Sequence, residues 1–314
     1  MDMNSDLNHW SNYWNSGNLT SLPQDFLENY DGEIASFWET SFKLLPKQSN
    51  ILDLCTGNGA IALLACSYSK IFEMDFRVVG VDAAKIEKQS ITHKYPHLEG
   101  ELHNIQFISE CKIEDIDLPS AKFELITSQY GIEYCNWQQS AKQVSRLLKP
   151  GGYFAFISHA KSTAILKFME REKEEYESLQ SLGLFSVFAS YFNRKFRYKE
   201  TVKKLNKIQK KILELHKLRP SDLFWGVLSF LQRIINMDKT TFVRLEKEIE
   251  SMYMQYRYAY VRLQDIVAVS HKIDNEPEWY LVFEKEGLKL DKEGEILQTG
   301  HHNAGKYYQF SRPE

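Results

Sequence analysis

The sequence predicts an α/β fold built on a mostly parallel β-sheet. Between residues 50 and 160, short apolar runs alternate with segments of helical periodicity, a pattern typical of strand–helix–strand units. A long helix-compatible stretch then occupies residues 161–265, and strand-like segments return after Asp274. Of the 314 residues, 43% are hydrophobic and 26% are charged. Such a chain can bury a sizeable core, and this composition argues against a disordered protein.

The expected elements follow in a regular order. A helix over Gly32–Leu45 is expected before Pro46, within an aromatic segment at residues 1–49. The expected strands are Ile51–Leu54, Arg77–Asp82, Ile105–Ser109, Phe123–Thr127, Tyr153–Ser158, Trp279–Phe283, Leu288–Leu290, Ile296–Thr299 and Lys306–Phe310. Helices are expected at Ala60–Ser69 and Gln138–Leu148, and the second meets the stop signal Lys149-Pro150-Gly151-Gly152.

Cysteine spacing and the first residues narrow the class of protein. The four cysteines include no C-x-x-C pair, so we expect neither a zinc site nor a disulfide framework, and no metal is predicted. The first ten residues lack a basic region followed by an apolar run, which predicts no signal peptide. The apolar runs are too short to span a bilayer. We therefore expect a cytoplasmic protein with no membrane partner.

The segment with the strongest chemical signal is Ile51–Ala62, ILDLCTGNGAIA. A strand runs into a glycine turn and then into a helix, whose first N–H groups are free to bind a ligand. Gly57-x-Gly59-x-x-Ala62 fits the relaxed dinucleotide fingerprint, in which a pyrophosphate lies at the helix N-terminus. Asp53 favours a different cofactor, because its carboxylate would repel a pyrophosphate but attract an amino group and a sulfonium.

Asp53 and the glycine turn together resemble the motif of a known family. The run Asp53-Leu-Cys55-Thr-Gly57-Asn-Gly59 is similar to the D/E-x-G-x-G-x-G motif of class I S-adenosylmethionine (SAM)-dependent methyltransferases, with Cys55 in place of the first glycine. Three further stretches resemble that family in the same order: Val78–Asp82, Ile105–Pro119 and Leu147–Gly152. The resemblance covers residues 50–160 and, more weakly, residues 275–314.

The resemblance implies a Rossmann-like methyltransferase sheet of seven strands, the last antiparallel, with α-helices on both faces and a helical insertion after the fifth strand. Residues 50–160 and 266–314 would form the SAM-binding domain. From its aromatic residues, the segment 1–49 could fold over the cofactor as a lid, or pack as an arm on the surface or on a partner subunit. Residues 161–265 would form the insertion, as a substrate cap or a homodimer contact. The implied cofactor is SAM, and the product is S-adenosylhomocysteine.

The resemblance also implies a set of cofactor-binding residues. Asp82, at the end of the second strand, would accept hydrogen bonds from the ribose hydroxyls, and nicotinamide-binding folds use an acid there too. Glu114 would accept from the adenine amino group. The complete expected set is Asp53, Cys55, Gly57, Gly59, Asp82, Ala83, Ile113, Glu114 and Gln129.

The acceptor would lie outside the carboxyl ends of the strands. His159, after the fifth strand, is a candidate general base. Glu133 is a candidate base or cation ligand, and Tyr130 and Tyr134 could line the pocket, each with a structural role as the alternative. The fourth strand lacks the (N/D)-P-P-Y motif of many methyltransferases that modify amino groups of nucleobases.

We therefore expect a methyltransferase that acts on O or N of a small molecule by in-line displacement. Two alternatives concern its acceptor and its activity: an RNA or protein methyltransferase that docks through the insertion, and a non-catalytic SAM-binding regulatory protein. A nicotinamide-dependent oxidoreductase is disfavoured by Asp53. The overall net charge of -3 hides an asymmetry, since residues 194–219 carry a net charge of +9 and the rest of the chain carries -12. This asymmetry keeps nucleic acid open as a partner.

Overall fold

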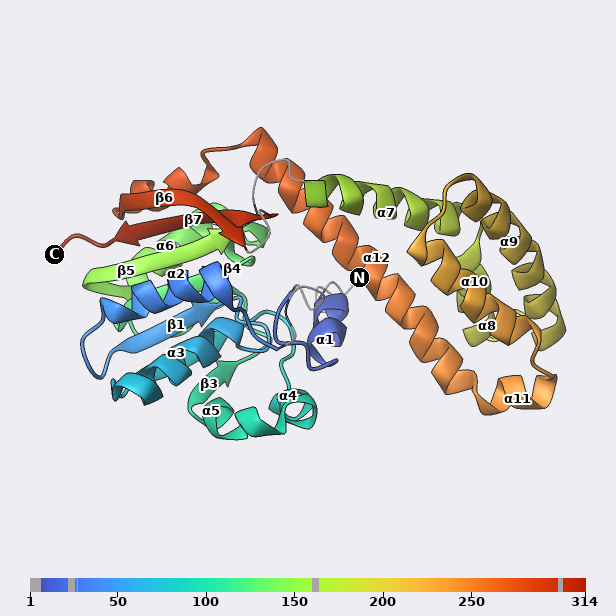
Figure 1. Cartoon of the computed structure of the whole chain (residues 1–314), viewed down its shortest axis with the longest axis horizontal. Helices are drawn as coiled ribbons and strands as arrows, with labels where there is room; N and C mark the ends of the chain where they lie inside the picture. Colours follow the sequence, from blue (N-terminus) through green and yellow to red (C-terminus); the bar gives the residue numbers. More distant parts are fainter. Residues whose placement is uncertain (1–6, 22–25, 27, 160–163, 299–301) are drawn as a thin grey trace. The chain divides into compact units, whose positions relative to one another are not determined.

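The computed structural model describes residues 7–21, 26, 28–159, 164–298 and 302–314. The chain divides into two compact units, one of residues 1–163 and 268–314 and the other of residues 164–267. Figure 1 shows both units.

The first unit contains a seven-stranded sheet in the order β3-β2-β1-β4-β5-β7-β6. Its strands are β1 Asn50–Leu54, β2 Arg77–Val81, β3 Ile105–Ile108, β4 Phe123–Gln129, β5 Leu148–Ser158, β6 Lys289–Gln298 and β7 His302–Ser311. The first five are mutually parallel, whereas β7 runs antiparallel to both β5 and β6. The predicted Rossmann-like methyltransferase sheet is thereby confirmed.

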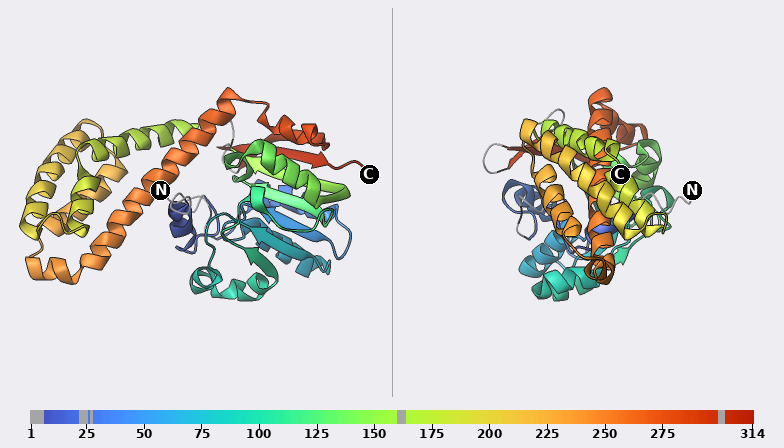
Figure 2. Two further views of the ribbon diagram at one scale, coloured as in Figure 1. Left: turned by 180° about the vertical axis from the view of Figure 1, so that it is seen from behind. Right: turned by 90° about the vertical axis from the view of Figure 1, so that its right-hand side faces the viewer.

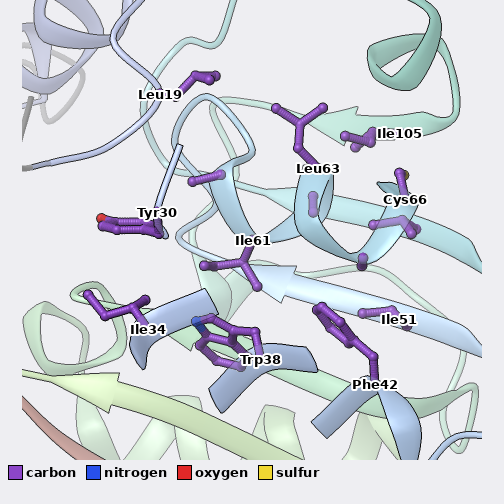
Figure 3. Packing of buried hydrophobic residues seen from close by; sticks show 14 of the residues in the cluster. Leu19, Tyr30, Ile34, Trp38, Phe42, Ile51, Ile61, Leu63, Cys66 and Ile105 are labelled. Atoms are coloured by element: carbon purple, nitrogen blue, oxygen red, sulfur yellow. The ribbon is translucent and has the colours of Figure 1, made fainter. Parts of the chain in front are cut away.

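Helices cover both faces of this sheet because its strands are buried on both sides. The helices of the unit are α1 Asn8–Trp14, α2 Gly32–Lys43, α3 Ala60–Phe72, α4 Lys88–Lys94, η2 Pro96–Leu98, α5 Glu99–His103, η3 Ile113–Asp115, η4 Ile132–Tyr134, α6 Trp137–Leu147, η5 Trp279–Leu281 and α13 Val282–Lys285. On one face, Trp38 and Phe42 of α2 pack with Ile61 of α3 around Ile51 (Figure 3). On the other face, seen in the left view of Figure 2, α6 and α13 pack against Leu52 and Leu54.

Some predicted elements differ from the structure. The expected strand Trp279–Phe283 is wrong, because this run forms η5 and α13. Trp279, Val282 and Phe283 all pack in one core cluster, which the helical i, i+3, i+4 spacing allows. The strands expected at Leu288–Leu290 and from Ile296 both overlap the single strand β6, which begins at Lys289, and Thr299 lies outside the described residues. Strand β5 begins at Leu148, so it includes the stretch expected to be only a turn.

The second unit is helical. Its helices are α7 Ala164–Ser181, α8 Leu184–Phe192, α9 Tyr198–Leu218, α10 Asp222–Ile235 and α11 Lys239–Arg244, followed by α12 Glu246–Asn275, which continues past residue 267. On one face of α9, Leu205, Ile208 and Ile212 are buried in the core of this unit. None of the helices in the described part of the chain is long and apolar enough to cross a membrane.

Candidate functional site

The glycine turn after β1 has three residues in the left-handed region. Cys55 has φ +54°, Gly57 φ +52° and Gly59 φ +83°. Glycine adopts such angles without steric cost, whereas a side chain with a Cβ is strained there. This backbone requirement explains why a glycine is common at the position of Cys55 in the motif. Gly59 is the N-cap residue of α3, whose N-terminus faces the turn.

The Asp53 carboxylate holds this turn from inside the protein. It is 1% exposed, and it accepts hydrogen bonds from Thr56 Oγ1 to Oδ2 (2.6 Å) and from Thr127 Oγ1 to Oδ1 (2.8 Å). Burial raises the pKa of Asp53 to about 7, against the lowering effect of these two hydroxyl groups. The structure therefore places both carboxylate oxygens on threonine hydroxyls, and the predicted contact of Asp53 with SAM remains a prediction.

Asp82 follows β2 and receives two backbone N–H groups. Gly57 N–H donates to Oδ2 and Ala84 N–H donates to Oδ1, each at 2.7 Å. Asp82 and the adjacent Ala83 are both half-buried, so the carboxylate keeps lone pairs for further donors. Burial raises the pKa of Asp82 to about 6. This donor and acceptor pattern fits a ribose, whose hydroxyl groups would donate to the carboxylate.

The expected adenine residues lie in η3. Ile113 is buried in the core under this turn. The Glu114 carboxylate accepts the backbone N–H of Asn136 (2.8 Å), the N-cap residue of α6, and the Glu114 carbonyl accepts a hydrogen bond from Gln143 Nε2 (3.0 Å). Glu114 therefore has a structural role at the start of α6, and its contact with adenine stays a prediction.

The N-terminal helix α1 packs onto the glycine turn. Asn58 is fully buried, and its Nδ2 donates to the carbonyls of Trp14 and Asn18, each at 2.8 Å. The Trp14 ring lies so close that a Cβ on Gly57 would be 2.5 Å from Trp14 Cζ2. Lys85 N–H, near the end of β2, donates to Ser11 Oγ (3.0 Å). The glycine turn and the segment after β2 thus hold α1 beside the carboxyl ends of the strands (Figure 1).

Gln129 ends β4 and is held by a residue that the sequence did not single out. Its Oε1 accepts Trp38 Nε1 from α2 at 2.6 Å. Sequence reasoning also missed Thr56, Asn58 and Thr127 as residues that shape the turn. Thr56 and Asn58 occupy variable positions of the motif. Their position within the motif was the one feature of the sequence that could have indicated their role in the turn. Thr127 and Trp38 become neighbours of the site only through the fold.

Glu133 and His159, predicted separately, form one hydrogen-bonded unit. Glu133 is fully buried in η4 after β4, and His159 follows the last residue of β5. Glu133 Oε1 contacts His159 Nδ1 at 2.7 Å and accepts the His159 backbone N–H at 3.0 Å. The ring centroids of Tyr130 and Tyr134 lie 5.0 and 5.9 Å from that of His159, and Tyr130 Oη donates to the Ala304 carbonyl.

Several solved structures resemble this chain. A putative methyltransferase from Haloferax volcanii, in complex with the Trm112 methyltransferase activator, shares 9% identity over 97% of this chain and 98% of that chain, with a TM-score of 0.49. A geranyl diphosphate C-methyltransferase from Streptomyces coelicolor A3(2), in complex with Mg²⁺, geranyl diphosphate and S-adenosyl-L-homocysteine, shares 15% identity over 50% of this chain and 65% of that chain, with a TM-score of 0.37.

Other similarities cover less of the matched protein. The match to a geranyl diphosphate methyltransferase in complex with sinefungin has 14% identity and a TM-score of 0.35, over 41% of this chain and 45% of that chain. The match to the [4+2]-cyclase SpnF covers 47% of that chain, so this chain spans about half the length of these two proteins. No curated protein matches the chain in sequence.

A family model gives the assignment. The model described as "Methyltransferase domain" matches residues 45–216, more than half of the chain, and includes the glycine turn, Asp82 and the Glu133–His159 unit. The chain therefore belongs to the methyltransferase-domain family, a family of class I enzymes whose cofactor is S-adenosylmethionine.

Proposed function

We propose that this protein transfers a methyl group from SAM to an O or N atom of a small-molecule acceptor by in-line displacement. The observation that carries the proposal is the Glu133–His159 unit at the carboxyl ends of β4 and β5. It lies at the same edge of the parallel sheet as the glycine turn after β1. In such sheets, ligands bind at this edge.

The residues present fit the cofactor. Asp82 would hold the ribose hydroxyls. The Trp14 ring lies against Gly57 and the Phe107 ring against Gly59, so Trp14 would have to move before a ligand could approach the backbone of Gly57. When bound, SAM supplies a methyl group already activated by a sulfonium. What the protein must add is alignment of the acceptor, exclusion of water and removal of a proton from the acceptor.

The proton is removed by His159 in this proposal. With His159 Nδ1–H donated to the Glu133 carboxylate, the lone pair of the neutral ring lies on Nε2. The second contact, from the His159 backbone N–H to the same oxygen, fixes the position of the residue. The His159 side chain is 24% exposed, so its ring can be reached by an acceptor. Glu133 would orient the imidazole and stabilise the imidazolium that forms.

Water exclusion is assigned to α1, as the lid expected from the sequence. Trp14 covers Gly57, and the Trp10 ring meets the Tyr134 ring edge-on with centroids 6.0 Å apart. One short helix therefore touches both the cofactor turn and the aromatic residues beside His159. Opening of α1 would admit the ligands, and closing it would remove water from the reacting atoms.

The proposal is tested with labelled SAM and a fraction of small metabolites, with formation of S-adenosylhomocysteine as the readout. With the acceptor found in that screen, His159→Ala should lower kcat by roughly 10²- to 10⁴-fold, as expected for loss of a general base. Glu133→Gln should lower kcat and shift the pH–rate profile. Affinity for S-adenosylhomocysteine, measured by calorimetry, should stay close to wild type in both variants.

The matched control is His103→Ala, since His103 is an exposed histidine on α5, outside the proposed site. Wild-type kcat in His159→Ala, at saturating acceptor, would refute the general-base role. Binding of S-adenosylhomocysteine without methyl transfer to any acceptor would instead favour the non-catalytic SAM-binding protein.

A second candidate function, RNA methylation, is favoured by the surface of α9. Lys203, Lys207, Lys210, Lys211 and Lys217 are exposed on this helix. None of them forms an ion pair with a carboxylate in the described part of the chain. Phosphate contacts by these lysines would make RNA binding strongly salt-dependent.

The RNA candidate is tested by binding measurements at several salt concentrations. RNA binding that falls steeply with added salt, and that is lost in the triple variant Lys203→Ala, Lys207→Ala, Lys210→Ala, would support this candidate. Lack of RNA binding at low salt would rule it out.

A homodimer through the helical insertion also remains a proposal. Sedimentation of the wild-type chain over a range of concentrations tests it.

A further inference from the structure

Two cysteine thiols from distant parts of the sequence meet beside the proposed site. The Sγ atoms of Cys55 and Cys135 lie 3.7 Å apart. Cys55 lies in the glycine turn after β1, and Cys135 follows η4 after β4. Because β1 and β4 are parallel neighbours in the sheet, their carboxyl ends bring the two residues together. The sequence did not predict this contact, as the residues are 80 positions apart.

Local packing holds both sulfurs in place. Cys135 Sγ–H donates to the Gly131 carbonyl at 3.7 Å, which leaves the Cys135 sulfur as the acceptor for the Cys55 thiol. Gly131 has no side chain, and a Cβ there would be 2.2 Å from the Cβ of Cys55. The glycine therefore gives Cys55 the room to point toward Cys135. Both cysteines are half-buried rather than sealed in the core.

The other two cysteines differ. Cys66 is 6% exposed in the core under α3, and Cys111 contacts the carbonyl of its neighbour Lys112. All four cysteines are free thiols. Among the described residues, the contact between Cys55 and Cys135 is the one sulfur–sulfur approach that the structure records.

We propose that Cys55 and Cys135 are a redox modification site, in which a peroxide converts the two thiols to a disulfide that weakens cofactor binding. The Cys135 thiolate attacks one oxygen of hydrogen peroxide, which breaks the O–O bond and gives a sulfenic acid and water. The Cys55 thiolate then attacks the Cys135 sulfur, forms the S–S bond and expels hydroxide, which takes up a proton as a second water. Two thiols and one peroxide give one disulfide and two waters.

The bond would move two parts of the site toward each other. A disulfide brings its sulfurs to about 2.05 Å, so the present separation of 3.7 Å must shrink by about 1.6 Å. On one side, Cys55 is two residues before Gly57, whose N–H donates to Asp82. On the other side, Cys135 is two residues after Glu133, the partner of His159. A shift of this size is larger than the range of donor–acceptor distances over which a hydrogen bond forms.

The reduced form is the resting state of the two thiols. The hydrogen bond to Cys135 and burial raise the pKa of the Cys55 thiol well above its ordinary value. Thiolate is the reactive form, so this raised pKa slows the direct reaction of Cys55 with peroxide and keeps the thiol reduced in the absence of an oxidant.

The first test is chemical and independent of activity. The full-length chain is treated with hydrogen peroxide, and its intact mass should fall by two hydrogen atoms. Trypsin should then release a cross-linked product of two peptides, residues 48–70 and residues 123–142. Since Cys66 shares the first peptide with Cys55, the experiment is done in a Cys66→Ser background or with fragmentation of the peptide. Cys55 and Cys135 remaining separate thiols while Cys111 is oxidised would overturn the proposal.

The second test measures affinity for S-adenosylhomocysteine before oxidation, after oxidation and after reduction with dithiothreitol. Oxidation should weaken binding roughly tenfold, a coupling typical of linked sites, and reduction should restore it. Cys111→Ser, the matched control, should behave as wild type. Cys135→Ser should keep its affinity under peroxide. Formation of the disulfide with unchanged affinity would overturn the regulatory role.

This inference uses the proposed function only for its effect on methyl transfer. If the disulfide forms and affinity falls, but no acceptor is ever methylated, the redox site stands and the proposed catalytic function fails. If turnover is established and peroxide lowers it equally in wild type and Cys135→Ser, the catalytic function stands and the redox site fails.

Discussion

The buried Asp53 carboxyl predicts a dependence of stability on pH that one substitution should remove. Asp53 is 1% exposed, and burial raises its pKa to about 7. Because the folded state binds this proton more tightly than the unfolded state, raising the pH destabilises the fold. The contribution is fully present below the unfolded pKa of 3.8 and is lost as the pH rises through about 7. Asp53→Asn keeps the shape of the side chain and cannot ionise.

The size of the effect follows from the shift. A rise from 3.8 to about 7 corresponds to about 4 kcal/mol in all, at about 1.4 kcal/mol for each pH unit. Between about pH 5 and about pH 8, the wild-type chain should lose about 2–3 kcal/mol relative to Asp53→Asn. Other titrating groups are common to both chains, so the difference between the two curves isolates Asp53.

The assay is urea unfolding followed by tryptophan fluorescence. Trp225 is the single tryptophan between residues 164 and 267, and its side chain is exposed. In a Trp225→Phe background, the signal therefore reports the unit that contains Asp53. Free energies of unfolding are measured for both chains at several pH values, with the m-value as a check on two-state unfolding.

Thr127 provides the matched comparison. Thr127 Oγ1 donates to Asp53 Oδ1 (2.8 Å) and lowers the pKa of that carboxyl. Thr127→Val should move the loss of stability to higher pH, whereas Thr127→Ser should behave as wild type. Parallel stability curves for wild type and Asp53→Asn across this pH range would refute the reasoning, because they would mean that Asp53 is ionised in both the folded and unfolded states.

Three further outcomes are expected. Asp82→Ala should weaken S-adenosylhomocysteine binding by about 10- to 100-fold in calorimetry, which is the effect expected for loss of hydrogen bonds to a charged group. In wild type, affinity should fall as the pH drops below about 6, since only the ionised carboxylate accepts hydrogen bonds from both hydroxyls. An affinity that does not change with pH would count against this ribose contact. Trp14→Ala should speed S-adenosylhomocysteine dissociation roughly tenfold in stopped-flow measurements, and an unchanged rate would argue against α1 as a lid. Trp38→Phe removes the donor to Gln129 and should cost about 1–3 kcal/mol of stability in urea unfolding; wild-type stability would show that this buried bond is replaced.

Much of the sheet was predictable from local pattern. The apolar runs that form β1 to β5 are bounded by turn residues. The glycine motif identified β1 as the strand that leads into the proposed cofactor site. The run at Trp279 was misassigned because a short apolar stretch has the same composition in a buried helix as in a strand. Its packing against α6 and β5 in the tertiary structure determines that this run is helical.

The candidate site was predictable as a set of positions but not as a set of contacts. Residues such as Asp53 and Asp82 have a recognisable place relative to a strand end and a glycine turn. Their hydrogen-bond partners, Thr127 and the backbone of Gly57 and Ala84, come from other strands or from turn geometry. For Glu114, the partner at the start of α6 gives a structural role that sequence position alone did not suggest.

By itself, the sequence determined the strand–helix alternation, the glycine turn after the first strand and the basic charge of α9, because hydrophobic period, glycine placement and charge are local properties of the chain. The tertiary structure decided what those residues touch. It joined Glu133 to His159, placed α1 on the glycine turn and brought Cys55 to Cys135. These contacts exist because parallel strands that are far apart in the sequence end at the same edge of the sheet, an arrangement that depends on strand order and not on any local pattern.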